Sequence, residues 1–176
     1  MINITRLWTG AEQPADHLRY GLRHGGIHSA QASTAACIPA SSRARKPIVV
    51  WNITRTCNLR CIHCYADSHA EKYPGELTWE QCCAVIDDLA AYGASALLLS
   101  GGEPLLHPRL PDILERATTK GLKVTISTNG TRITPDYARL FKQLGVAYVG
   151  ISLDGIGEIH DQFRGVKGAF EGAIRG

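Results

Sequence analysis

The sequence predicts an α/β fold in which parallel strands alternate with helices. From residue 47 onward, short apolar runs rich in β-branched residues recur, and each is followed by a stretch that suits a helix. Glycine-rich or polar motifs come directly after the apolar runs. Strands and helices that alternate in this way form parallel βα units. About four such units fit into residues 47–176, which is too few to close an eight-stranded barrel.

Residues 1–46 differ from this pattern. Their periodicity is weak, and residues 25–46 are rich in alanine, serine and glycine and include Pro39. Such composition is typical of loops and linkers, although Asp16–Arg23 could form one short helix. We therefore expect a loosely structured leader and linker over 1–46 and an α/β domain over 47–176.

The first βα unit has clear boundaries. The β-branched run Ile48–Thr54 predicts a buried strand. Thr78 and Gln81 form the sequence pattern of a capping box, so a helix is expected to begin there. Gly93 supplies the stop of that helix.

The remaining units follow the same cycle. Strands are expected over Ala96–Ser100, Leu122–Ser127 and Val146–Leu153, and helices over about Pro108–Lys120 and Thr134–Leu144. Thr134 followed by Pro135 is a helix-start signal. Residues 169–176 look like a further helix that stops without a capping signal, so the sequence reads as truncated.

Composition excludes several classes of function. The net charge is only +3, and the basic cluster Arg43, Arg45 and Lys46 has no interleaved aromatic residues, so we expect a solvated linker and no nucleic-acid partner. No apolar run reaches the roughly 18 residues of a membrane span, and Met1–Arg6 does not resemble a secretory signal. A cytoplasmic protein follows. In that reducing compartment its six cysteines suit metal ligands better than disulfides.

Cys57, Cys61 and Cys64 follow the first predicted strand with the spacing Cys-x-x-x-Cys-x-x-Cys. The spacing lets the three thiolates face one point, and thiolates are the soft ligands of iron–sulfur clusters and of zinc. Three cysteines leave one iron of a cubane cluster open to bind a substrate. The alternatives are buried thiols or a structural zinc site completed by His63 or a distant histidine, although a zinc ribbon would show two Cys-x-x-Cys pairs.

The other cysteines and histidines carry weaker signals. Cys82 and Cys83 are neighbours on a helix, so their side chains diverge and we expect structural thiols; Cys37 lies in the linker. His63 is expected to donate to the ligands as an outer-shell residue. His24, His28, His107 and His160 are expected at the surface or in loops.

Three further motifs follow the later strands: Ser100–Pro104, Ser127–Gly130 and Ser152–Gly155. Because parallel strands place their ligand sites at their carboxyl ends, these motifs and the cysteines are expected to converge. Gly101 and Gly102 allow close approach to the main chain, and Glu103 can accept a hydrogen bond from an ammonium group. The alternative is an ordinary βα turn in which Glu103 begins a helix.

Together, the Cys57–Tyr65 loop and Gly101-Gly102-Glu103-Pro104 resemble the radical S-adenosylmethionine (SAM) superfamily over about residues 47–170. The resemblance implies a partial TIM-type (βα)6 barrel, here limited to about its first four units, and a 4Fe–4S cluster whose open iron chelates SAM. Cleavage of SAM would give methionine and a 5′-deoxyadenosyl radical. The implied SAM contacts are Glu103 to the ammonium group, Gly101 and Gly102 through their main chain, Tyr65 to the adenine, and Thr128, Ser152 and Asp154 to the carboxylate and ribose.

A narrower resemblance is to the tetrapyrrole-modifying branch, which includes enzymes of the alternative haem pathway and of haem d1 synthesis. It rests on motifs such as Trp51–Cys61, Tyr148–Gly155, His160–Gly165 and Leu18–Arg23. It implies removal of side chains from an iron porphyrinoid (didecarboxysiroheme to iron-coproporphyrin), an electron donor such as flavodoxin or ferredoxin, and auxiliary-cluster cysteines beyond this region.

Two alternatives remain open at the level of the sequence. One is a peptide- or cofactor-maturing radical SAM enzyme, and the other is a zinc-binding or iron–sulfur electron-carrier module. Alone, this stretch of chain is expected to be inactive, because later strands usually supply the substrate contacts.

Overall fold

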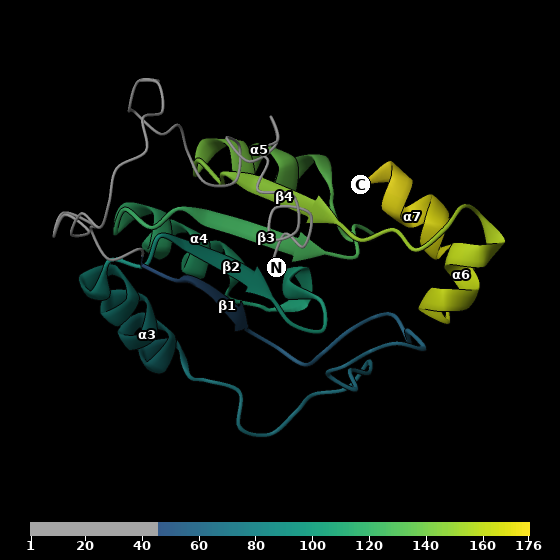
Figure 1. Ribbon diagram of the computed structural model, residues 1–176, viewed down its shortest axis with the longest axis horizontal. Helices are drawn as coiled ribbons and strands as arrows, with labels where there is room; N and C mark the ends of the chain where they lie inside the picture. The colour runs from purple at the N-terminus through teal and green to yellow at the C-terminus, as the bar shows by residue number, and fades with distance from the viewer. Residues whose placement is uncertain (1–45) are drawn as a thin grey trace, which may run out of the picture. The chain divides into compact units, whose positions relative to one another are not determined.

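The computed structural model describes residues 46–176, which contain a four-stranded parallel sheet and its helices (Figure 1). The expectations for the leader, including its short helix, Cys37, His24 and His28, lie outside the described residues. Within residues 46–176, no helix combines the length and the apolar character that crossing a membrane would need.

The strands lie in the sheet in their order along the chain. They are β1 (Ile48–Asn52), β2 (Ala96–Ser100), β3 (Val124–Thr128) and β4 (Tyr148–Ile151). Every neighbouring pair is parallel, with Trp51 opposite Leu99 and Leu99 opposite Ile126. The predicted parallel α/β architecture is confirmed, although β1 and β4 end two residues earlier than their apolar runs.

The helices occupy the connections between strands and the segment after β4. They are α3 (Trp79–Tyr92), the 3₁₀ helix η1 (Pro104–Leu106), α4 (Leu110–Thr119), α5 (Pro135–Gln143), α6 (Glu158–Arg164) and α7 (Ala169–Arg175). The sequence did not predict α6. In Figure 1, α6 and α7 lie beyond the arrowheads of β3 and β4, at the carboxyl ends of the strands.

The core lies between the sheet and the helices that connect its strands. Leu97 and Leu99 of β2 and Val124 and Ile126 of β3 are fully buried among apolar side chains of α3, α4 and α5. On the other face of the sheet, Ile48 and Val50 of β1 are 55% and 58% exposed. One face of the sheet therefore carries the hydrophobic core, and the other is open in the described residues.

Two helix starts form as their sequence signals predict. Thr78 Oγ1 accepts from the Gln81 amide at 3.4 Å, and the Thr78 amide donates to Gln81 Oε1 at 2.9 Å. Thr134 Oγ1 accepts from the Tyr137 amide at 3.3 Å. Each cap satisfies backbone donors that the first turn of a helix leaves free.

Replacing Thr78 by alanine is expected to lower the free energy of unfolding by about 1 kcal/mol, because an N-cap hydroxyl contributes about that much. Urea unfolding followed by circular dichroism measures the change. Thr118→Ala is the control, since Thr118 donates only to carbonyls within α4. Equal losses in the two variants would show that the cap contributes nothing of its own.

Candidate cofactor-binding site

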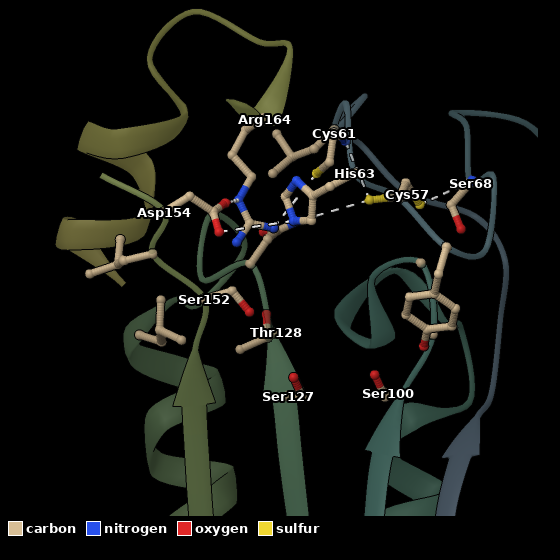
Figure 2. A pocket seen from close by; sticks show the side chains of 18 residues that line it. Cys57, Cys61, His63, Ser68, Ser100, Ser127, Thr128, Ser152, Asp154 and Arg164 are labelled. Atoms are coloured by element: carbon tan, nitrogen blue, oxygen red, sulfur yellow. Dashed lines mark hydrogen bonds and ion pairs between the residues drawn. The ribbon is translucent and has the colours of Figure 1, made fainter. Parts of the chain in front are cut away.

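A cavity of about 540 Å³ opens at the carboxyl ends of the four strands. Side chains from the loop after β1, from the ends of β2, β3 and β4, and from α6 line it (Figure 2). Among them are nine of the ten residues singled out from the sequence: Cys57, Cys61, Cys64, Tyr65, Gly101, Gly102, Thr128, Ser152 and Asp154. The structure thus brings together motifs that lie up to 97 positions apart, Cys57 to Asp154.

The three cysteines border the same cavity in different environments. Cys57 is buried, whereas Cys61 and Cys64 are half-buried. Within residues 46–176, no three Cys, His, Asp or Glu side chains converge as the ligands of a single ion would. This differs from the expectation that the three thiolates face one point. Cysteine ligands of a cluster bind separate iron atoms, so they do not need to meet at one point.

Each cysteine sulfur accepts a hydrogen bond. The Leu59 amide donates to Cys57 Sγ at 3.4 Å and the Ser68 amide to Cys64 Sγ at 3.5 Å, while Arg164 Nη1 lies 3.6 Å from Cys61 Sγ. Burial raises the pKa of the Cys57 thiol. Burial also acts to raise the pKa of Cys64, but the amides of Ser68 and Ala66 outweigh it, so that pKa lies below its ordinary value. Donors around the sulfurs stabilise the thiolate form that metal ligation requires.

Ser68 provides an independent test of whether a sulfur-rich group fits here. Ser68 is 3% exposed and lines the cavity, and its hydroxyl makes no hydrogen bond of ordinary geometry among the described residues, although it lies near enough to Cys64 to help lower the pKa of that thiol. A buried hydroxyl is normally paired. The thiols and this free donor on one cavity wall fit an iron–sulfur cluster, whose sulfur atoms accept hydrogen bonds.

Gly101 and Gly102 allow two segments of the chain to approach closely. A Cβ on Gly101 would lie 2.3 Å from Thr54 O, and one on Gly102 would lie 2.5 Å from Arg55 O. The Gly102 amide donates to Thr54 O at 2.8 Å, and the Glu103 amide donates to Thr56 O at 2.9 Å. Both glycines line the cavity, but their missing side chains make room for the start of the cysteine loop.

Glu103 is the one predicted site residue that does not line the cavity. Its side chain is fully buried and accepts from the Leu105 amide at 3.0 Å, Thr128 Oγ1 at 2.8 Å and the Asn129 amide at 2.8 Å. Burial raises the pKa of this carboxyl, and the three donors oppose that shift. The structure differs here from the expectation of a carboxylate facing a ligand, because both oxygens join the end of β2 to the end of β3. Glu103 also caps η1, as the alternative interpretation held.

The remaining predicted contacts line the cavity in different ways. Thr128 is buried and donates to Glu103, and the Ser152 amide donates to Thr128 O at 3.0 Å. Asp154 Oδ2 lies 2.7 Å from Arg164 Nε, a close ion pair whose N–H is not aligned as in a hydrogen bond. Tyr65 is 78% exposed and donates from its hydroxyl to Asn52 Oδ1 at 3.2 Å.

Two histidines that the sequence places at the surface or in loops, His107 and His160, are buried. His160 lies on α6 and is 1% exposed. Its Nδ1 accepts from the Asp154 amide at 3.2 Å. His107 lies in a loop as expected but is buried there; its Nδ1 accepts from the Arg109 amide, and burial lowers its pKa. His63 lines the cavity, and its Nε2 lies 3.9 Å from Asp154 Oδ1.

Two further residues were given no role from the sequence. Asn129 donates from Nδ2 to Asn58 Oδ1 at 3.0 Å, and that nitrogen also lies 4.0 Å from Cys57 Sγ. Arg164 joins Asp154 to Cys61. Asn129 lies inside the strand-end motif Ser127–Gly130, and Arg164 lies inside His160–Gly165, which was noted for its resemblance alone. Only the tertiary arrangement shows what these two residues contact.

Comparison with known sequences gives one family. The radical SAM superfamily profile matches residues 51–176. Fe-coproporphyrin III synthase of Methanosarcina barkeri is 46% identical over 176 residues, which are 100% of this chain and 42% of that protein. Pre-heme d1 synthase of Dinoroseobacter shibae is 47% identical over 131 residues, 74% of this chain and 32% of that protein. Mycofactocin maturase MftC of Mycobacterium tuberculosis is 38% identical over 128 residues, 72% of this chain and 32% of that protein. The chain therefore spans less than half the length of these relatives.

Solved structures agree on the fold. Streptococcus suis SuiB bound to S-adenosylmethionine superposes with a TM-score of 0.61 at 17% identity, over 72% of this chain and 30% of that one. Native anSMEcpe with bound AdoMet superposes with a TM-score of 0.57 at 25% identity, over 73% and 38% of the two chains. The four-stranded sheet is thus part of the barrel seen in radical SAM enzymes.

Proposed function

The chain belongs to the radical SAM superfamily, and on this premise we propose that Cys57, Cys61 and Cys64 hold a 4Fe–4S cluster and that the cavity beside them binds SAM. Members of this superfamily use both. The observation that carries the proposal is that the three cysteines, each with a hydrogen-bond donor at its sulfur, share one cavity with the ends of β2, β3 and β4. Residues 47–176 would then form the first part of the core domain, with 1–46 as leader and linker.

Held by Cys57, Cys61 and Cys64, the cluster would supply the single electron needed for reductive cleavage of SAM, and SAM would thereby supply the radical chemistry applied to the substrate. The residues of this chain bind and orient the cosubstrate. Gly101 and Gly102 would offer main-chain groups to its ammonium end, and Thr128, Ser152 and Asp154 would face its carboxylate and ribose. Tyr65 would lie beside the adenine. Glu103 does not line the cavity and would act from behind its wall by fixing Thr128.

For the substrate we propose an iron tetrapyrrole from which side chains are removed, with a flavodoxin or ferredoxin as electron donor. The support is the pattern of similarity. The match to Fe-coproporphyrin III synthase extends over 176 residues and so includes the first 46, whereas the match to pre-heme d1 synthase covers 131. Maturation of a peptide or a cofactor is the second candidate, because mycofactocin maturase MftC is 38% identical over 128 residues.

Electron paramagnetic resonance of anaerobically reconstituted, dithionite-reduced protein tests the cofactor proposal. We expect a reduced 4Fe–4S signal that changes when SAM is added, because the open iron would gain a ligand. A colourless zinc protein, or a cluster signal indifferent to SAM, would contradict the proposal and favour a zinc or electron-carrier module. Optical titration of the protein with an iron porphyrinoid and with an unrelated peptide then separates the two substrate classes.

A further inference from the structure

Arg164 is the one charged donor among the groups that hydrogen-bond to the three cysteine sulfurs in the described residues. Cys57 and Cys64 accept from backbone amides, whereas Cys61 Sγ lies 3.6 Å from Arg164 Nη1. Hydrogen bonds that involve an ionised donor are roughly twice as strong as those between neutral groups. Figure 2 shows the Arg164 side chain extending between Asp154 and the cysteine loop.

The backbone around Arg164 holds its side chain in this place. The Arg60 amide donates to Arg164 O at 2.9 Å, and the Ile62 amide donates to Phe163 O at 3.0 Å. Gly165 has a φ of 66°, and a Cβ there would lie 2.2 Å from Arg60 O. The end of α6 is therefore fastened to the cysteine loop, so Arg164 and Cys61 keep their relative position.

A second charge balances the guanidinium. Arg164 Nε lies 2.7 Å from Asp154 Oδ2, and the two side chains are 9% and 25% exposed. Charges removed from water interact more strongly than exposed ones. The cysteine loop thus faces a positive charge that Asp154 partly neutralises.

We propose that Arg164 and Asp154 together set the reduction potential of the cluster, with Arg164 acting through the Cys61 sulfur. The inference rests on the proposed cluster. Reduction adds one electron to a group already rich in negative charge. A nearby cation favours that step and a nearby anion opposes it, and cluster potentials respond to hydrogen bonds at the sulfurs and to local charge. Arg164 is then a positioning residue for the electron-transfer step.

Redox titration followed by electron paramagnetic resonance, without SAM and at one fixed pH, tests the proposal. For Arg164→Gln we expect the ratio of reduced to oxidised cluster at a given ambient potential to fall by on the order of tenfold, which corresponds to about 59 mV for a one-electron couple. Arg164→Lys keeps the charge and should recover part of this loss. Asp154→Asn should shift the ratio in the opposite direction.

The control is Arg139→Gln, an exposed arginine paired with Asp136 on α5. It should leave the potential unchanged. Shifts of the same sign in Arg164→Gln and Asp154→Asn, or no shift in either, would overturn the proposal. If the Arg164→Gln protein holds no cluster, Arg164→Lys is compared with Asp154→Asn in its place. Shifts of the same sign in these two variants, or no shift in either, would again overturn the proposal. Wild-type protein without a 4Fe–4S signal would instead refute the proposed cofactor.

Discussion

Replacing Cys57, Cys61 or Cys64 by alanine is expected to abolish the 4Fe–4S signal and the broad visible absorption of the reconstituted protein. Each cysteine would bind a different iron atom, and among residues 46–176 no other thiol lines the cavity to replace a lost one. SAM binding should fall with cluster content, because the proposed cluster would hold one end of the cosubstrate. Iron and sulfide analysis, visible absorption and equilibrium binding of SAM measure the three effects.

Cys83→Ala is the matched control for these variants. Cys83 is also a free, half-buried cysteine, but it lies on α3 and not at the cavity. The control should keep the iron content of the wild type. A Cys61→Ala protein with a full complement of iron and sulfide would show that the ligand assignment is wrong.

Replacing Glu103 by alanine is expected to lower the free energy of unfolding by about 3–5 kcal/mol, even in protein that holds no cluster. The change leaves the Leu105 amide, the Asn129 amide and the Thr128 hydroxyl without their acceptor, and a buried unpaired donor costs about 1–3 kcal/mol. Glu103→Gln should cost less, because its amide oxygen can still accept, although its NH₂ group would face one of the donors. Urea unfolding of the cluster-free protein measures both.

This experiment distinguishes two roles for Glu103. A carboxylate that only binds the ammonium group of SAM would leave the stability of the cluster-free protein unchanged and would lower SAM affinity alone. A carboxylate that joins β2 to β3 lowers stability first. Glu115→Gln, at an exposed position on α4, is the control and should change neither property.

Much of the fold could be predicted because its signals are local. Thr78, Gln81 and Gly93 mark the ends of α3, and the apolar run Ala96–Ser100 matches β2 residue for residue. The convergence of the four motifs also followed from the sequence, because parallel strands bring their carboxyl ends to one edge. Helix α6 has seven residues and begins after Gly157 without a side-chain cap, so no capping signal marks its start in the sequence.

The parts of the site that could not be predicted depend on contacts between distant segments. In the sequence, Glu103 looks like a carboxylate that binds a ligand. In the structure it is buried and accepts from Thr128 and from the Asn129 amide, which lie about 25 positions further along the chain. Likewise, Gly101 and Gly102 suggest room for a ligand. In the structure, the carbonyl groups of Thr54 and Arg55 occupy the space that side chains at these two positions would need. No local pattern shows which segment will fill the space beside a glycine.

The order of the strands has a consequence for how the site is assembled during synthesis. Because β1, β2, β3 and β4 are adjacent in the sheet in the order in which they are made, each new strand meets its partner as soon as it leaves the ribosome. β1 waits only for β2, the next strand in the chain. The cysteine loop is different, because the amides of Arg60 and Ile62 find their acceptors only when Phe163 and Arg164 have been made, about 100 residues afterwards. Iron insertion is therefore expected to follow translation of α6, when the loop first has a fixed shape to receive it.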